Sequence, residues 1–519
     1  MLFTSYEFIA FLAVFFLLYY IVPKKCQYLL VLLFSYIFYY IANPVFLIYI
    51  LVTTISVYLI ALLVQKNFDA QDLYLKEKKE ELTKEEKKKY KSIQKSRRAL
   101  LVDLVLVINV GILALVKYSD FLFKGINLSF MGLVIPMGIS YYTIQAIGYV
   151  LDVKRGMVKA EKNFFKVALF VSFFPQLVQG PISRYADLSE TLYGEHKFDY
   201  KQFSFGLQRI LWGFFKKLVI ADRLLPAIIT ITGDIDKYNG AYALLAMFLY
   251  TADLYADFTG GIDITIGIAQ SIGVSVKENF IRPYFSKSLK EYWRRWHITM
   301  GTWFRDYIFY PVSMSKPLIK FSKFLKKHCG DRIGKRAPVY ISSFAVWFVT
   351  GIWHGANWTF IVWGLLNWFI LMVSEELEPL YDKFQNKTHL DRKTWYRGFQ
   401  ALRTFFMVTC LKLFDCYSSV GDTFRAFASM LTVKNYNIFF DGTVFTLGLS
   451  AKDFIVVALA ILVVFAVSMI QRSGSVREKI SKKPFAFRAT VWAALIIVTV
   501  VFGAYGIGYD SSQFIYNRF

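Results

Sequence analysis

The sequence predicts an all-α polytopic membrane protein. Its composition is the first reason: of 519 residues, 56% are hydrophobic and only 19% are charged, whereas soluble proteins carry about 25% charged residues. The second reason is that several apolar runs approach the ~20 residues that a helix needs to cross a bilayer. These runs cover residues 8–22, 27–42, 45–64, 99–116, 454–470 and 489–507.

Positive charge lies mainly between the apolar runs. The chain has 61 Lys and Arg residues against 37 Asp and Glu residues, which gives a formal charge of +24. Basic loops mark the cytoplasmic side of membrane proteins, so this surplus indicates topology, and we expect no nucleic-acid partner. Placing Lys24, Lys25 and the block at 76–98 in the cytoplasm makes the first three runs alternate, with the N-terminus outside. The basic segment 472–488 likewise predicts an external C-terminus.

The remaining organisation is that of one integral membrane domain, residues 1–519. The block at 76–98 mixes Lys and Glu at helical spacing and predicts a solvated cytoplasmic segment held by ion pairs. Between about residues 160 and 380 the apolar stretches are shorter and are interrupted, for example at 176–181. Such interruptions survive at membrane depth only when they are buried in protein or line a water-filled cavity. We therefore expect a cavity or tunnel in this part of the chain.

His354 is the first candidate for chemistry. It lies in the apolar stretch 339–373, which is broken by glycines and Asn357 and has basic flanks on both sides. This pattern predicts a re-entrant hairpin from the cytoplasm with His354 at its turn. An ionisable residue at that depth is a functional hypothesis by default, and histidine suits proton abstraction near neutral pH. The alternative is a neutral imidazole that ties helices together.

His297 is the second candidate and lies in a segment rich in Trp and Arg. On a helix, Trp293 and His297 share a face with Met300 and Phe304, while Arg294 and Arg295 point elsewhere. The same composition suits an anchor at the membrane interface, and from the residues alone the anchor is favoured.

Carboxylates also occur in the apolar interior. Asp253 and Asp257 share a helix face, and Asp263 follows an expected break at Gly260-Gly261. These groups could orient a histidine, bind a cation or bond to a helix end. The histidines and scattered carboxylates lack the spacing of a metal site, so we predict no metal.

Several motifs in order resemble membrane-bound O-acyltransferases (MBOAT), in the bacterial alginate O-acetylation branch. They are Pro136-Met-Gly138, Gly180-Pro181, Tyr255-Ala-Asp257-Phe-Thr-Gly-Gly-Ile-Asp263, Glu278-Asn279-Phe, Trp293-Arg-Arg-Trp-His297, Trp303-Phe-Arg305-Asp306 and Gly351-Ile-Trp353-His354-Gly355-Ala-Asn357. The resemblance covers nearly the whole chain. It implies a bundle of roughly 11 or more transmembrane helices with re-entrant or broken helices around a central tunnel.

The resemblance also implies an O-acyltransferase of a bacterial cell membrane. His354 is then the catalytic histidine and His297 a second functional histidine in the same tunnel. Supporting or substrate-binding roles are assigned to Asn357, Asp257, Trp293, Arg294, Arg295, Arg305 and Trp353. One departure is visible at residues 402–415, because relatives often end this span with Trp-x-Phe-Phe-Arg-Ala, whereas this chain has Lys412-Leu-Phe-Asp415-Cys. The departure leaves the acceptor open.

The implied substrates lie on the two sides of the membrane. The donor, acetyl-CoA or another acyl donor, would enter from the basic cytoplasmic side formed by residues 277–336, and no bound cofactor is expected. A partner acyltransferase outside would place the acyl group on a polysaccharide. Two alternatives remain: a D-alanyl transfer protein for teichoic acid, which takes its donor from a carrier protein, and a transporter or export channel, which broken helices also permit.

Overall fold

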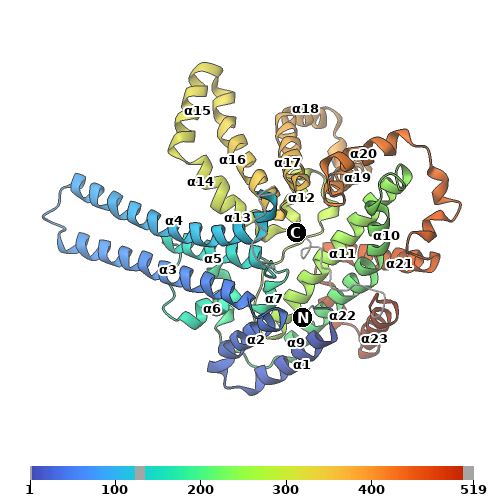
Figure 1. Ribbon diagram of the computed structural model, residues 1–519, viewed down its shortest axis with the longest axis horizontal. Coiled ribbons are helices and arrows are strands. Elements are labelled where there is room, and N and C mark those ends of the chain that lie inside the picture. The colour runs from blue at the N-terminus through green and yellow to red at the C-terminus, as the bar shows by residue number, and fades with distance from the viewer. Residues whose placement is uncertain (1–2, 123–134, 506–519) are drawn as a thin grey trace. The chain divides into compact units, whose positions relative to one another are not determined.

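The computed structural model describes residues 3–122 and 135–505, and every regular element within these ranges is a helix (Figure 1). The expected C-terminal location falls on residues 506–519, which lie outside the described ranges. Two compact units are formed, one by Met1–Gly206 with Thr265–Lys277 and the other by Leu207–Ile264 with Glu278–Phe519. The prediction of a single domain stays a prediction.

The first unit is built on a long helical hairpin of α3 and α4, drawn in blue in Figure 1. The charged block at 76–98 forms the tip of this hairpin. Thr83 and Glu86 cap the start of α4 reciprocally, because Thr83 N donates to Glu86 Oε2 at 2.8 Å and Glu86 N donates to Thr83 Oγ1 at 3.2 Å. The unit's helices are α1 (Tyr6–Ile21), α2 (Gln27–Ala42), α3 (Phe46–Glu77), α4 (Lys84–Leu122), α5 (Ile139–Lys154), α6 (Phe164–Ser172), α7 (Phe174–Leu177) and α8 (Tyr185–Leu192).

The expected interruption near 176–181 is present and buried in protein. Side-chain hydrogen bonds connect parts of this region: Gln176 Nε2 donates to Pro181 O at 3.0 Å and to Ser183 Oγ at 2.7 Å. Ser183 N in turn donates to Gln145 Oε1 at 3.1 Å, and Gln145 Nε2 donates to Phe170 O at 2.7 Å. Glutamines thus replace the helical hydrogen bonds that the break removes.

The second unit includes α11 (Ala241–Ser271) as far as Ile264, and this helix runs without a break through Gly260-Gly261. The expected break was wrong because these glycines serve close packing: a Cβ on Gly213 would lie 2.5 Å from Gly260 O. The unit's other helices are α9 (Tyr200–Phe214), α10 (Asp222–Gly233), α12 (Leu289–Arg295), α13 (Ile298–Phe304), α14 (Tyr310–Ser313), α15 (Lys316–Cys329), α16 (Asp331–His354), α17 (Trp358–Glu376), α18 (Glu378–Thr388), α19 (Thr394–Lys412), α20 (Val420–Thr432), α21 (Ala451–Ile470), α22 (Val476–Ser481) and α23 (Phe485–Phe502).

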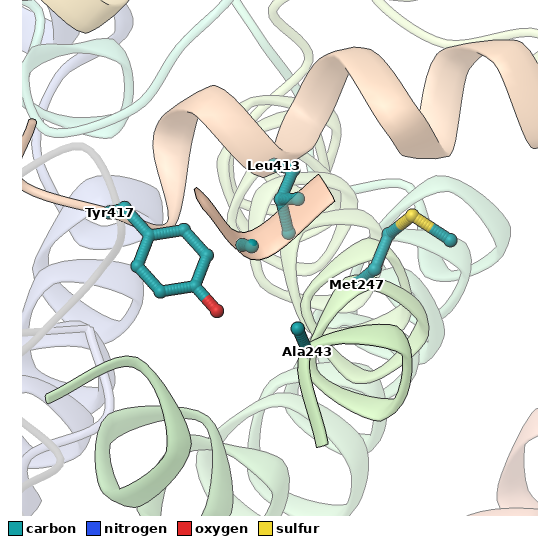
Figure 2. Packing of buried hydrophobic residues seen from close by; sticks show 5 residues of the cluster. Ala243, Met247, Leu413 and Tyr417 are labelled. Carbon is teal, nitrogen blue, oxygen red and sulfur yellow. The ribbon is translucent and has the colours of Figure 1, made fainter. Parts of the chain in front are cut away.

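The start of α11 holds the end of α19 in place. Ala243 and Met247 of α11 pack against Leu413 and Tyr417, which follow α19, and against Ala426 of α20, and all five are buried (Figure 2). Burial of these side chains stabilises the packing of the three helices because it removes apolar surface from water or polar surroundings. The cluster fixes the position of Lys412, the residue before Leu413.

Six helices in the described ranges are long and apolar enough to cross a membrane: Lys24–Ala42, Phe46–Glu77, Lys84–Ser119, Trp358–Glu376, Ala451–Ser473 and Phe485–Phe502. Five of them contain, or largely overlap, five of the apolar runs in the sequence. The first run is the shorter apolar helix α1, and the sixth candidate span is α17. An all-helical protein with several membrane-spanning helices is confirmed.

α16 and α17 form the predicted helical hairpin, and glycines allow their close approach. A Cβ on Gly351 would lie 2.6 Å from Phe360 O, and one on Gly364 would lie 2.5 Å from Trp347 O. Both contacts are with backbone atoms of the opposite helix, so the helices would have to move apart to admit a side chain.

We predict that Gly364→Ala lowers thermal stability, because overpacking of a tight contact typically costs about 1–3 kcal/mol. Gly398→Ala on α19 is the matched control, since a Cβ there meets nothing within 4 Å. That change should stabilise its helix by roughly 0.5–1 kcal/mol. The melting temperatures of the two variants in detergent measure these effects. Melting temperatures that shift in the same direction would contradict the packing argument.

Candidate active site

His354 is the last residue of α16, at the turn of the hairpin. The turn ends at Asn357, whose Oδ1 accepts from Thr359 N at 3.1 Å and so caps α17, while its Nδ2 donates to Ser418 O at 2.9 Å. α16, which ends at His354, has 24 residues, or ~36 Å of helix. It is longer than the apolar part of the stretch because its charged first turns are also helical. The location of the hairpin turn deep in the membrane stays a prediction.

His354 faces a small cavity with aromatic walls, of about 30 Å³. The imidazole lies edge-on to Trp363, with ring centroids 4.9 Å apart, and near Phe360 at 6.2 Å. A cavity of this size accommodates one or two water-sized groups. Its lining consists of His354, Leu254, Tyr292, Trp293, Trp296, Trp363, Asn367, Val408, Leu411, Lys412 and Asp415.

Trp293 is a wall of this cavity rather than a surface anchor. Its Nε1 donates to Asn367 Oδ1 at 3.0 Å, and Asn367 Nδ2 donates to Trp363 O at 2.9 Å. The indole also lies edge-on to Trp347, 4.9 Å between centroids. These bonds join α12 to α17 and set the aromatic surface beside His354.

His297 lies at a break between two short helices. α12 ends at Arg295 and α13 begins at Ile298, and His297 between them has φ +48°, in the left-handed region. The expected continuous helix with Trp293, His297, Met300 and Phe304 on one face was therefore wrong. The left-handed conformation is unfavourable for a residue with a Cβ, so other contacts must hold it.

Asn279 supplies those contacts. Its carbonyl O accepts from Ile298 N at 3.0 Å, and its Oδ1 accepts from Thr299 N at 3.0 Å and from Thr299 Oγ1 at 2.9 Å. The same Oδ1 lies 3.3 Å from His297 Nδ1. Asn279 and His297 are both fully buried. Sequence reasoning assigned Asn279 no role, although it belongs to one of the quoted motifs.

Trp353 connects the two histidines. Its ring centroid lies 5.2 Å from that of His354 and 6.0 Å from that of His297. His297 also lies edge-on to Phe258 at 4.9 Å. The structure thus brings together both predicted histidines, with Trp353 between them.

Asp257 binds a buried lysine. Its Oδ1 lies 2.6 Å from Lys217 Nζ, and the same ammonium lies 2.7 Å from Asp222 Oδ1. Lys217 belongs to a π-helical segment, Phe215–Ala221, a conformation that often marks functional regions. Such a pair is costly to break from one side, because the remaining charge is left buried. Asp257 therefore has a structural partner.

The three predicted arginines differ in their partners. Arg294 is exposed, Arg295 pairs with Glu291 at 2.5 Å, and Arg305 pairs with Asp306 at 2.9 Å. Two of the three positive charges are thus partly neutralised by neighbouring carboxylates.

Lys412 is the site residue that sequence reasoning missed. It is 4% exposed and lines the His354 cavity. Its ammonium lies 4.3 Å from the ring centroid of Trp296 and 4.7 Å from that of Tyr284, whose hydroxyl it also bonds. Aromatic faces stabilise a desolvated cation. The signal in the sequence was the departure from relatives at this position.

No group of three or more His, Cys, Asp or Glu side chains in residues 3–122 and 135–505 could hold a metal ion. The functional groups described above are imidazoles, the amino groups of Lys217 and Lys412, carboxylates and indoles. Such a set can transfer protons and stabilise developing charge.

The fold and the site define a helical protein with several candidate membrane spans, in which a fully buried His297 and a partly buried His354 both lie near Trp353. Residues 160–420 match the model of the membrane-bound O-acyltransferase family, MBOAT. The match covers half of the chain and includes both histidines. The chain belongs to this family, as the sequence motifs predicted.

Relatives within the family carry different activities in their names. The chain is 36% identical over 269 residues to a probable alginate O-acetylase of Azotobacter vinelandii, a match that covers 50% of each chain. It is 30% identical to a peptidoglycan O-acetyltransferase of Helicobacter pylori, over 55% of this chain and 57% of that protein. It is 28% identical to a teichoic acid D-alanyltransferase of Bacillus subtilis, over 48% and 61%. The chain spans about half the length of the alginate relatives that it matches.

We predict that Asn279→Ala disturbs His297 more than loss of one hydrogen bond explains. The change leaves Thr299 N buried without its acceptor, which costs about 1–3 kcal/mol, and releases the left-handed backbone. Thr299→Val is the matched control, because it removes only the hydroxyl contact. Melting in detergent should show a clearly larger loss for Asn279→Ala, and equal losses would contradict the role of Asn279.

Proposed function

We propose that the protein is an O-acyltransferase that moves an acyl group, in our reading acetyl from acetyl-CoA, toward O-acetylation of a polysaccharide outside the cytoplasm. The observation that supports this most is the position of His354: it closes a helical hairpin, faces an aromatic cavity, and belongs to a chain of the MBOAT family. No bound cofactor takes part, since the acyl donor is a substrate.

In this mechanism His354 is the general base. A hydroxyl acceptor is a poor nucleophile while protonated, so His354 removes the proton as the oxygen attacks the thioester carbonyl carbon. The C–O bond forms, the C–S bond breaks, and the thiolate leaves with the proton that His354 held. A transient acyl-histidine, which divides the transfer into two steps, is the alternative.

The developing oxyanion needs a donor, and the cavity offers one. The side chain of Lys412 lines the same cavity as His354, and a preorganised hydrogen-bond donor in a site that excludes water stabilises such an oxyanion. Asn357 is a second candidate donor, but its Nδ2 donates to Ser418 O. Asn357 would have to give up this bond to take that role.

His297 would bind or orient a reactant. It is fully buried and its Nδ1 lies beside Asn279 Oδ1, so its ring is held in one orientation. Trp353 and Trp293 would form the walls that exclude water from the reacting groups. Asp257 would support this region by holding Lys217.

The wider arrangement belongs to the same proposal. We infer roughly 11 or more spans with broken helices around a central tunnel, in a bacterial cell membrane with both termini outside. A partner acyltransferase outside would accept the acyl group and deliver it to an exopolysaccharide or cell-wall polymer. The lipid bilayer is the only other partner, and no nucleic acid is involved.

Two other functions are tested by the same assay. A teichoic acid D-alanyl transfer protein would take its donor from a carrier protein, and one relative carries that name. A transporter or export channel would move its cargo without acyl chemistry.

We predict that His354→Ala lowers acyl transfer by ~10²–10⁴-fold, the usual effect of losing a general base. The loss of acyl transfer in His297→Ala should be smaller, or this change should act mainly on the binding of a reactant. Purified protein is given labelled acetyl-CoA or a charged carrier protein, and labelled acceptor is counted. The mechanism would be refuted if monodisperse His354→Ala protein transferred acyl groups at a near-normal rate. Use of the charged carrier protein alone as donor would favour D-alanyl transfer. Transport of a cargo without acyl turnover would favour a channel.

We also predict that neutralising Arg294, Arg295 and Arg305 together raises the donor KM more than it lowers kcat. Charge at an entrance acts chiefly on the binding of a phosphate-bearing donor. Because two of these arginines have carboxylate partners, Arg294 alone should carry much of the effect. An unchanged KM in folded protein would return the three residues to an interface-anchor role.

A further inference from the structure

The charged, aromatic and packing residues of α15 (Lys316–Cys329) lie on three separate faces of the helix. Residues that follow one another at spacings of four, three and four positions share one helix face. Three such rows, each displaced by one residue from the one before, occur in α15. We name them the basic row, Lys316-Lys320-Lys323-Lys327, the aromatic row, Pro317-Phe321-Phe324-His328, and the packing row, Leu318-Ser322-Leu325-Cys329.

The packing row holds α15 against α16, which lies beside it (Figure 1). Leu318 is buried, and Ser322 Oγ donates to Gly334 O at 2.7 Å. A Cβ on Gly334 would lie 2.6 Å from Lys326 Cβ, so the two helices are in direct contact at this point. The contact with α16 thus uses one face of α15 and leaves the other two rows on different faces.

The aromatic and basic rows are exposed. Phe321 and Phe324 are 43% and 57% exposed, although burial of a phenylalanine is strongly favourable. All four lysines of the basic row are exposed, and none of them pairs with a carboxylate in the described part of the chain. Lys326, which lies outside this row, does have such a partner, because its Nζ lies 2.6 Å from Asp331 Oδ1. α15 therefore presents positive charge without neutralising partners beside exposed aromatic rings.

The contacts of α16 place α15 beside one end of a candidate membrane span. Glu376 is the last residue of the span formed by α17, and it pairs with Arg332 at 2.6 Å and also with Arg336. These two arginines flank Gly334, the residue against which α15 packs. The C-terminal half of α15 therefore lies near the end of the span, where hydrocarbon gives way to lipid headgroups.

α15 cannot itself cross the membrane. Its 14 residues form ~21 Å of helix, which is shorter than the ~30 Å of hydrocarbon. The basic row begins at the first residue of the helix and continues to Lys327, so neither end can enter hydrocarbon without a high cost. A helix at the membrane boundary that can neither cross nor enter the hydrocarbon has to lie along the interface.

We propose that α15 is an interfacial helix that binds anionic phospholipid headgroups. The basic row would contact the phosphates, and Phe321 and Phe324 would enter the boundary between headgroups and acyl chains, as in other amphipathic helices at membrane surfaces. Lysines without carboxylate partners favour an anionic lipid over a zwitterionic one. The exposed aromatic row and the adjacent end of a membrane span favour the bilayer over an acidic protein as the partner. This membrane contact does not depend on the proposed enzymatic function.

Quenching of a fluorescent label at Cys329 by lipids tests the proposal. Cys329 is exposed at the end of α15, and Cys26, the other exposed cysteine, is replaced by Cys26→Ser. The full chain is placed in nanodiscs of phosphatidylcholine and phosphatidylglycerol, with bromine on the acyl chains of one lipid or the other. At equal mole fraction, we expect the relative binding constant to favour phosphatidylglycerol at least fivefold, because a single lysine near an anionic surface contributes roughly this factor.

Two variants with equal changes of charge test the basic row. Replacing all four of its lysines by glutamine should abolish the preference for phosphatidylglycerol. The matched control removes four exposed lysines from the start of α4, with the changes Lys84→Gln, Lys88→Gln, Lys89→Gln and Lys91→Gln. This control should leave the preference unchanged, and melting shows whether each variant is folded.

A variant that leaves the charge unchanged tests the aromatic row. Phe321→Ser with Phe324→Ser should reduce quenching by both brominated lipids, because the helix would lie further from the acyl chains. Equal quenching by the two lipids in the unmodified rows, or equal loss of preference in the two lysine variants, would overturn the proposal. Quenching by aqueous iodide but by neither lipid would show a solvated helix and would also overturn it. Protection of the label from iodide only when a charged carrier protein is added would assign this face to a protein instead.

Discussion

The second unit depends on two aspartates of α11 that hold cations from other elements. Charges in an apolar interior are expensive, and a buried pair broken from one side typically costs about 3–5 kcal/mol. The positions of the cations are therefore constrained by the helix that carries the acids. Asp257 binds Lys217, and Asp263 binds Lys216 and Arg209. One helix thus fixes the positions of three cations from other elements.

Much of the helical framework could be predicted because its signals are local. Apolar runs of sufficient length become helices whatever surrounds them, since no other structure satisfies the backbone in lipid. The hairpin ending at His354 was predictable for the same reason: glycines and Asn357 interrupt an apolar stretch, and Asn357 caps the second helix. His354 and His297 were identified because an ionisable residue among apolar ones is itself informative.

The errors have non-local causes. His297 adopts a left-handed backbone because Asn279, distant along the chain, bonds the residues beside it, and helical periodicity carries no trace of that contact. Gly260-Gly261 suggested a break, yet α11 continues because the backbone at Gly213 packs against it. In both cases the sequence indicated that the residue was unusual. The cause of its conformation or packing is a contact with a distant residue, which only the folded structure shows.

Lys412 belongs to the segment in which the sequence departs from the motif that the resemblance leads one to expect. Residues around the two histidines follow the shared motifs, whereas Lys412 and Asp415 stand where relatives often have another ending, and the structure places both in the lining of the His354 cavity. A change of charge beside a base alters which groups can bind there and how a developing oxyanion is stabilised. The names of relatives differ in the polymer that is modified. The wall at the end of α19 is the part of the His354 cavity in which a difference of this kind would change the groups that can bind.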